Sequence, residues 1–295
     1  MTIANGVIHK KLMTHQSTPL ISIVVAVYNG AKTLQQCIDS VSHQTYPNKE
    51  LIIIDGGSLD GTVELLKSNQ ENIAYWISEP DRGIYNAWNK GVSQAKGEWI
   101  CFLGADDYFW DTRVLDQVIS QLAKISPEIN VAYGQVMLLN GDGEKLYTIG
   151  ESWKVVKNRF QQLMSIPHPG TMHRAGLFRK YGNFDETFRI AGDYELLLRE
   201  LKSGDAIFVN DIIIAGMRQG GISGHPKNTL ISLLEARRAQ RMHGQSYPGL
   251  HWVMAYLRVR IRMMLWILLG ETVARGFLDF GRRAVGLKAF WSKVQ

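Results

Sequence analysis

Between residues 20 and 103, short apolar runs alternate with segments whose apolar residues lie three or four positions apart. Residues 20–28 form a nearly continuous β-branched run, which is typical of a strand buried on both faces. Because strands and helices follow one another at short intervals, we expect a mostly parallel sheet with helices on both faces. The pattern predicts further strands at 51–54, 73–77 and 99–103, and helices at 31–44, 62–69 and 82–95.

The pattern changes after about residue 125. Residues 131–139 and 144–149 flank the sequence NGDG, which is a hairpin signal, and residues 206–217 predict another strand. From about residue 228 the chain is expected to be helical, with an interruption at the sequence YPG of residues 247–249. The sequence therefore predicts an α/β fold with a mostly parallel first half, a mixed second half and a helical C-terminal extension.

The composition is that of a globular protein. Apolar residues make up 45% of the 295 residues and charged residues 20%. This is enough apolar material for a large core, which excludes disorder as the dominant state. Two cysteines, Cys37 and Cys101, are too few for a disulfide scaffold or a cysteine-rich zinc module.

The net charge of +6 is concentrated at one end of the chain. The last 45 residues hold eight Lys and Arg against two Asp and Glu, whereas the first 250 residues hold 25 of each sign. A neutral body argues against nucleic acid as a partner. A basic, aromatic-rich tail instead predicts contact with an anionic surface such as a membrane.

Residues 1–18 are polar, lack the apolar core of a secretory signal, and are expected to form a flexible N-terminal tail. Within the last 45 residues the longest stretch without charge is 263–270, far shorter than the roughly 20 residues that cross a bilayer. We therefore expect a cytoplasmic protein, a location that also suits two unpaired cysteines.

Acidic residues follow three of the four predicted strands, and ligands of such sheets bind at the carboxyl ends of the strands. Asp106 and Asp107 are adjacent, so they repel each other, and a divalent cation bridging to phosphate is a natural counter-charge. The alternative is that Asp107 or Asp111 caps the following helix. Asp55 could accept a hydrogen bond from a nucleoside, or could simply be a turn residue before a helix.

The segment 81–91 places Asn86, Asn89 and Lys90 on one side of a predicted helix, where they could face phosphates or only water. No GxGxxG follows the first strand, and no Gly-Lys-Ser/Thr follows the glycine pair at 56–57. A dinucleotide-binding site and a P-loop are therefore not indicated.

Taken together, these motifs resemble those of the family 2 glycosyltransferases with the GT-A fold, of the bacterial surface-polysaccharide type. The resemblance covers about residues 19–225. It rests on PLISIVVAVYN at 19–29, LIIIDGGSLDGT at 51–62, the segment 81–91 and FLGADD at 102–107.

This resemblance implies how the chain is divided and what it does. A GT-A domain at 19–225 would comprise a donor half, 19–125, and an acceptor half, 126–225, followed by a basic helical extension, 226–295. The expected activity is inverting transfer of a sugar from a nucleoside diphosphate sugar, with UDP as the expected nucleotide, to a glycan hydroxyl in polysaccharide biosynthesis. The alternative is a non-catalytic nucleotide-sugar or glycan-binding module.

The resemblance also implies roles for single residues on the donor side. Val27 would line the base, Asp55 would accept from it, Asp106 would hold the ribose side, and Asp107 would take Mg²⁺ or Mn²⁺. Gly104 departs from the family, because many members carry an acid at that position. Further donor contacts are predicted at Asn29, Asp81, Asn86, Lys90 and Arg218, and a further metal ligand at His225.

On the acceptor side, the segment 191–199 resembles the acidic motif at the start of an acceptor-side helix. Asp193 would be the general base, with Glu195 as the fallback. The alternative is that Asp193 only caps that helix, where the helix dipole favours an acid. His168 would line the acceptor site, or would be a structural histidine like His173.

The tail lies outside the clear resemblance. Its spacing predicts an amphipathic helix with a largely basic polar face, as in helices that lie on membranes. The alternative is a helix packed on the domain or in an oligomer. We expect a lipid-linked acceptor and a peripheral position on the inner face of the cell membrane. The apolar side would carry Phe277, Phe280, Ala284, Leu287 and Trp291, and the opposite side Arg275, Asp279, Arg282 and Arg283.

Overall fold

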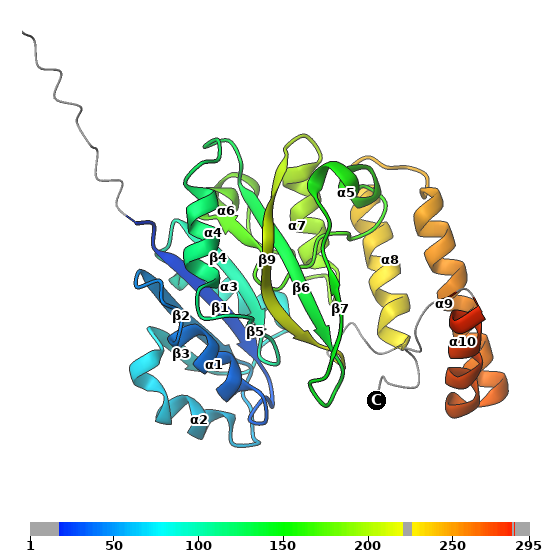
Figure 1. Ribbon diagram of the computed structural model, residues 1–295, viewed down its shortest axis with the longest axis horizontal. Coiled ribbons are helices and arrows are strands. Elements are labelled where there is room, and N and C mark those ends of the chain that lie inside the picture. Colours follow the sequence, from blue (N-terminus) through cyan, green and yellow to red (C-terminus); the bar gives the residue numbers. More distant parts are fainter. Residues whose placement is uncertain (1–17, 221–225, 285, 287–295) are drawn as a thin grey trace, which may run out of the picture.

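The computed structural model describes residues 18–220, 226–284 and 286. Within this part of the chain, nine strands form one sheet in the order β3-β2-β1-β4-β8-β6-β9-β5, and β7 pairs with β6 (Figure 1). The strands are β1 (Ile21–Val27), β2 (Lys49–Asp55), β3 (Tyr75–Ser78), β4 (Trp99–Gly104), β5 (Tyr108–Phe109), β6 (Val131–Leu139), β7 (Lys145–Ile149), β8 (Met172–Arg174) and β9 (Ala206–Arg218).

The first four strands, β1 to β4, are parallel, as predicted. β1 lies between β2 and β4, and β3 pairs with β2 at the edge. Six of the seven residues of β1 are buried because strands flank it on both sides and helices cover both faces. This arrangement brings the ends of β1 and β4 side by side.

The second half of the sheet is mixed, which confirms the change of pattern after residue 125. β8 runs antiparallel to both β4 and β6, and β6 and β7 form the predicted hairpin. β9 runs parallel to β6 and antiparallel to β5. One sheet therefore continues through both predicted halves of the domain.

Helices cover both faces of the sheet, and alternate residues of β1 contact the two layers. Ile23 and Val25 lie in a core with residues of α1 and α4, whereas Val24 lies in a second core with residues of α3 and α7. The helices are α1 (Leu34–Ser42), α2 (Thr62–Ser68), α3 (Ile84–Gln94), α4 (Val114–Leu122), α5 (Trp153–Phe160), α6 (Ala175–Tyr181), α7 (Gly192–Leu201), α8 (Pro226–Met242), α9 (Leu250–Leu269) and α10 (Glu271–Ala284).

The donor-side helices are shorter than predicted. α3 begins after Gly83, whose φ of 118° is not helical, so Arg82 stays outside. At the start of α2, Asp60 accepts a hydrogen bond from the Thr62 N–H at 3.2 Å, whereas the Ser58 hydroxyl donates to Asp55.

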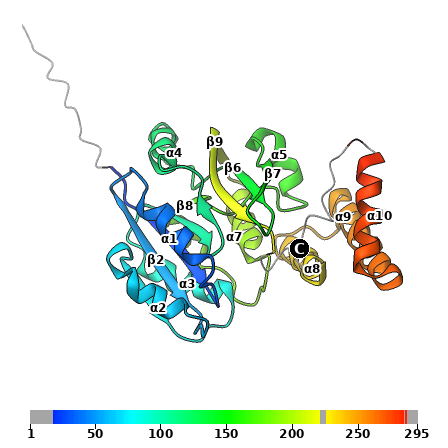
Figure 2. The same ribbon diagram turned by 60° about the horizontal axis from the view of Figure 1, so that its bottom comes forward.

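The three C-terminal helices lie at one end of the sheet, beyond β7 and α5 (Figures 1 and 2). α8 packs on α7, α9 on α8, and α10 on α9. Among the described helices, none has both the length and the apolar character needed to cross a bilayer. The division between domain and extension at 225/226 stays a prediction. Residues 1–17 of the predicted tail 1–18 lie outside the described residues, as do Leu287 and Trp291.

Candidate functional site

A cavity of about 1970 Å³ opens at the carboxyl ends of β1 and β4 and extends to the C-terminal helices. Both predicted halves of the domain contribute to its walls, as expected for a ligand site in an α/β sheet. Eight of the residues predicted to serve the donor, the metal or the acceptor line it: Val27, Asn29, Asp81, Asp106, Asp107, His168, Asp193 and Arg218.

The paired carboxylates fold back over the end of β4. The Gly104 N–H donates to Asp107 Oδ2 at 3.1 Å. A Cβ atom on Gly104 would lie 2.7 Å from Asp106 Oδ1 and 2.9 Å from Asp107 Oδ2. The glycine that departs from the family pattern is therefore the feature that gives both carboxylates room here.

Burial and mutual repulsion act on the same pair. Burial, and next the charge of Asp106, raise the pKa of Asp107 to about 8. Burial also raises the pKa of Asp106, whereas the positive charge of Arg218 lowers it. Two carboxylates that resist losing both protons are stabilised by a divalent cation, which prefers oxygen ligands.

The pair fits a cation that takes further ligands from elsewhere. In the part of the chain that the structure describes, no three His, Cys, Asp or Glu side chains are grouped to hold a metal ion. The other predicted ligand, His225, lies outside the described residues. Asp106 and Asp107 would thus supply two carboxylate groups, and a diphosphate or water the remaining oxygens.

Asp193 lies at the start of α7, half-buried in the cavity wall. The Tyr85 hydroxyl donates to Asp193 Oδ1 at 3.3 Å. Burial, and next the charge of Asp193, raise the pKa of Tyr85, so its hydroxyl keeps its proton. A Cβ atom on Gly192 would lie 2.8 Å from the Tyr85 ring, so a glycine at this position allows the contact.

Hydrogen bonds to a residue of the C-terminal extension hold the backbone directly before α7. Glu235 of α8 accepts hydrogen bonds from the N–H groups of Arg189, Ile190 and Ala191 at 2.8, 2.8 and 2.9 Å. A carboxylate that accepts three backbone N–H groups holds the segment in one conformation. Glu235 therefore helps to position Asp193, although no sequence motif pointed to it.

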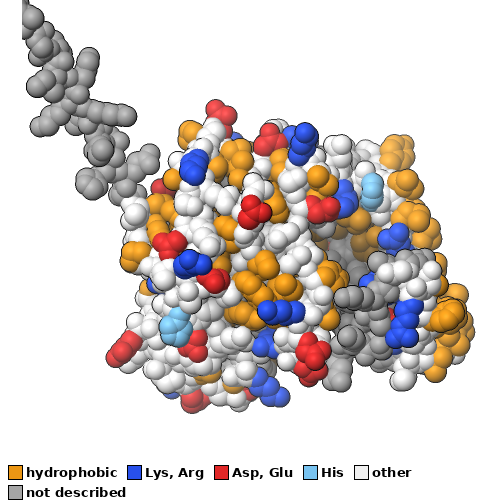
Figure 3. Space-filling view, viewed as in Figure 1, with side chains coloured by type: hydrophobic (Ala, Val, Ile, Leu, Met, Phe, Trp, Pro, Cys, Tyr) orange, Lys and Arg blue, Asp and Glu red, His pale blue; other side chains and the backbone are white. Residues whose placement is uncertain are grey.

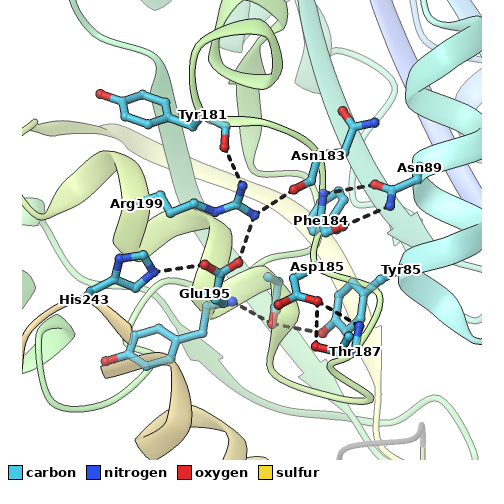
Figure 4. A network of polar contacts seen from close by, with 12 residues as sticks. Tyr85, Asn89, Tyr181, Asn183, Phe184, Asp185, Thr187, Glu195, Arg199 and His243 are labelled. Carbon is cyan, nitrogen blue, oxygen red and sulfur yellow. Dashed lines mark hydrogen bonds and ion pairs between the residues drawn. The ribbon is translucent and has the colours of Figure 1, made fainter. Parts of the chain in front are cut away.

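Asn86 and Asn89, considered as phosphate contacts in the sequence, instead contact another segment of the chain. Asn86 is buried and donates to Glu186 Oε2 at 3.0 Å, and Asn89 donates to Glu186 Oε1 at 3.0 Å. Asn89 also pairs with the backbone of Phe184 (Figure 4). Asn89 and Arg82 lower the pKa of Glu186 to about 2. Asn86 does not line the cavity, because it and Asn89 fasten the segment that leads to α7.

Two other predicted donor contacts also lie off the cavity wall. Lys90 pairs with Glu79 at 2.7 Å. Asp55 is buried, and its oxygens accept from Ser58 and from the Ser78 hydroxyl, the latter at 2.5 Å. Because Ser58 Oγ in turn accepts from the Asn29 N–H at 2.7 Å, Asp55 acts on the cavity through the loop it shapes.

Glu195, the predicted fallback base, does not line the cavity. Its side chain is 3% exposed and lies between Arg199 Nη2, at 2.8 Å, and His243 Nε2, at 2.9 Å (Figure 4). Arg199 also donates to the carbonyl oxygens of Tyr181 and Asn183. Asp193 and Glu195 are two residues apart, about half a helical turn, so they lie on opposite faces of α7. Asp193 therefore faces the cavity while Glu195 stabilises the interior.

Glu195→Gln is therefore expected to lower the free energy of unfolding by about 3–5 kcal/mol, because it leaves the Arg199 charge buried without its partner. Urea unfolding monitored by circular dichroism measures this. Glu98→Gln is the matched control, since its pair with Arg174 is more exposed and is expected to matter by at most about 1 kcal/mol. Unchanged stability together with lost turnover would restore Glu195 as the base.

His168 and Trp88 form an aromatic wall of the cavity, with ring centroids 5.0 Å apart. Among the described residues there is no hydrogen-bond partner for His168 Nε2 or Trp88 Nε1, although both atoms are buried. Burial lowers the pKa of His168, so its ring is neutral near pH 7. His173 is fully buried against Phe102 and does not line the cavity, so it is structural.

The model of the family described as "Glycosyl transferase family 2" matches residues 22–180, more than half of the chain. An uncharacterized glycosyltransferase of Rickettsia typhi is 31% identical over 203 residues, which cover 67% of this chain and 63% of that protein. The chain thus spans less than two thirds of this curated relative.

Solved structures share the fold. TarS 1–349 of S. aureus, in complex with UDP-GlcNAc, aligns with a TM-score of 0.63 at 16% identity, over 85% of this chain and 76% of that one. A longer TarS chain is covered to 43%. The mannosyltransferase PcManGT of Pyrobaculum calidifontis, in complex with GDP-Man and Mn²⁺, aligns with a TM-score of 0.60 at 17% identity, over 92% and 82%. These similarities show a GT-A fold.

Proposed function

Because the chain belongs to glycosyl transferase family 2, we propose that it transfers a sugar from a nucleoside diphosphate sugar to a glycan hydroxyl, with inversion, in polysaccharide biosynthesis. UDP is the proposed nucleotide, in line with the UDP-GlcNAc bound to TarS, whereas PcManGT binds GDP-Man. The observation that carries the proposal is one cavity lined by the carboxylates of Asp106, Asp107 and Asp193, which come from distant parts of the chain.

The donor is assigned to the strand ends. Val27 and Asn29 would line the base, with Asp81 beside them, and Arg218 would meet the diphosphate. Asp107, together with Asp106, would hold Mg²⁺ or Mn²⁺. A bound cation of this kind stabilises the charge that develops on the leaving diphosphate.

The acceptor is assigned to the opposite wall. Its hydroxyl must lose a proton as the oxygen attacks the anomeric carbon, and Asp193 would take that proton. Tyr85 orients the carboxylate by its hydrogen bond to Oδ1. Trp88 and His168 would offer their ring nitrogens to sugar hydroxyls, which matches the polar, buried position of these atoms.

The acceptor is proposed to be lipid-linked, with the enzyme held on the inner face of the cell membrane by α9 and α10. Apolar side chains line the outer face of both helices, and Figure 3 shows such side chains along the edge where Figure 1 places them. On α9 they recur every three or four residues and are between 44% and 72% exposed: Leu250, Met254, Leu257, Ile261, Met264 and Leu268. On α10 they are Val273, Phe277 and Phe280.

Charge favours a bilayer over a second copy of the chain as the partner of this face. At about 3.6 residues per turn, Arg258 and Arg260 project on the two sides of the α9 stripe, and both are exposed. Two stripes paired with each other would bring these arginines together, which is unfavourable. Anionic headgroups would instead surround the arginines while the apolar stripe enters the bilayer.

The test of the donor site is a thermal-shift screen of UDP, GDP, dTDP and CMP, each with and without Mn²⁺. A ligand that binds only the folded chain at 100 times its Kd stabilises it by about 2.7 kcal/mol, which is a shift of several degrees. We expect this shift with UDP and Mn²⁺, its loss in Asp107→Asn, and its retention in Asp142→Asn, an exposed carboxylate off the cavity.

The outcomes separate the proposal from its alternatives. No shift with any nucleotide would overturn the donor site. A shift with GDP alone would change the proposed donor. A shift with UDP, without sugar transfer to any glycan or to water, would favour a non-catalytic nucleotide-sugar-binding module.

A further inference from the structure

The inner faces of α9 and α10 form one end of the cavity, and this end has a distinct chemistry. Arg262, Met263, Trp266 and Ile267 of α9 line it together with Arg275 of α10. These residues lie far from the strand ends in sequence and outside the segments that resemble the family. The C-terminal helices thus contribute two cations and an apolar wall to a cavity that Asp106 and Asp107 line at the strand ends.

The acids of α9 and α10 whose side chains the structure describes do not line this end of the cavity. Asp279, the acidic residue of α10 whose side chain the structure describes, is buried and does not line the cavity. α9 contains no acidic residue. Arg262 is partly buried beside Trp266, with its guanidinium carbon 5.7 Å from the ring centroid, and Arg275 is also half-buried. Partial burial strengthens the attraction of both arginines for an anion.

The apolar residues continue from this end of the cavity to the outside. Met263 and Trp266 are half-buried, whereas Ile267 lines the cavity and is 81% exposed. Ile267 is followed by Leu268, which belongs to the outward stripe of α9. A hydrocarbon chain that left the cavity past Ile267 would therefore meet the apolar side chain of Leu268 on the outer face.

From this arrangement we infer that Arg262 and Arg275 bind the phosphate of a lipid-linked acceptor, while Met263, Trp266 and Ile267 contact the first part of its hydrocarbon chain. Guanidinium groups suit this task because they donate in pairs to phosphate oxygens. The inference rests on the proposed function and adds to it the residues that recognise the anionic link between glycan and lipid.

α9 supplies its own matched control, because Arg260 and Arg262 are two residues apart on opposite faces. The inward pair variant is Arg262→Gln with Arg275→Gln, and the outward pair variant is Arg258→Gln with Arg260→Gln. Each removes two positive charges from the extension of the full-length chain. Only the inward pair lines the cavity.

The experiment measures cosedimentation of the full chain with phosphatidylcholine vesicles that contain the same mole fraction of either polyprenyl phosphate or phosphatidylglycerol. We expect the wild type to prefer polyprenyl phosphate. The inward variant should bind polyprenyl phosphate vesicles roughly tenfold or more weakly, since each charge-assisted contact is strong, and so lose this preference. Its binding to phosphatidylglycerol vesicles should stay unchanged. The outward variant should bind both vesicles roughly tenfold more weakly with its preference intact.

Equal preference in the wild type and the inward variant would overturn the inference. Inorganic pyrophosphate, added as a competitor, tests whether the site binds a lipid-linked phosphate or a free one. Weak competition supports a lipid-linked ligand, and complete competition at micromolar concentration contradicts it. The UDP thermal shift is measured on the same variants. If the wild type shows the UDP thermal shift but no preference for polyprenyl phosphate, only the proposed phosphate site is wrong. If the wild type shows no UDP thermal shift, the proposed function is wrong.

Discussion

Asp193→Asn is expected to lower the rate of sugar transfer by roughly a thousandfold, because a positioned general base contributes about 10²–10⁴ to a rate. The amide has nearly the same shape as the carboxylate, and its oxygen can still accept from Tyr85. The loss should therefore fall on kcat, with little change in the binding of UDP and Mn²⁺. Steady-state kinetics, together with the thermal shift, measure the two effects separately.

Tyr85→Phe is the graded comparison for this prediction. It removes the hydroxyl that orients Asp193 and leaves the carboxylate in place, so we expect a smaller loss, on the order of tenfold. If Asp193→Asn retained a tenth or more of the wild-type rate, Asp193 would not be the base. If it abolished nucleotide binding instead, the residue would have a structural role at the start of α7.

The first four strands could be predicted to within one or two residues because each lies in a short apolar run, and β1, β2 and β4 are mostly buried. Two very short strands were missed. β5 is two residues long and β8 is three, so neither is long enough to show a period. Their positions follow from pairing with β9 and β4, which local sequence does not encode.

The site could be predicted where its residues directly follow strands. Asp106, Asp107 and Val27 line the cavity because parallel strands end at one edge of a sheet. The contact of Glu235 with residues 189–191 was missed, because it joins segments about 45 residues apart through α8. No short-range pattern reports such a contact.

The partners of the polar side of α3 could not be predicted, for a related reason. The spacing of Asn86 and Asn89 correctly indicates a shared polar side of α3, but spacing cannot distinguish a phosphate from another part of the chain as the partner. The partner is the segment around Glu186, about 100 residues away. Tyr85 and Trp88 lie three residues apart on the same helix and line the cavity. The spacing of these two aromatic residues was the sequence signal that could have placed them at the cavity.

Asp107→Asn is expected to lower transfer by about a thousandfold, since a metal ion supplies several kcal/mol of charge stabilisation and each 1.36 kcal/mol is tenfold in rate. Mn²⁺ binding in the presence of UDP should fall with it. Asp142→Asn, which removes an exposed carboxylate off the cavity, should change neither. An active Asp107→Asn variant with unchanged Mn²⁺ affinity would show that the cation is held elsewhere.

The raised pKa of Asp107 adds a pH dependence with a defined sign. Between the ordinary value of 3.8 and about 8, the folded chain holds a proton that the unfolded chain has lost. The free energy of unfolding of the metal-free protein therefore falls as pH rises through this window. Mn²⁺ competes with that proton, so its affinity should rise by up to about tenfold per pH unit from pH 6 to 8 and then level off. Electron paramagnetic resonance titrations at pH 6, 7, 8 and 9 measure this, and an affinity independent of pH would contradict the role of Asp107.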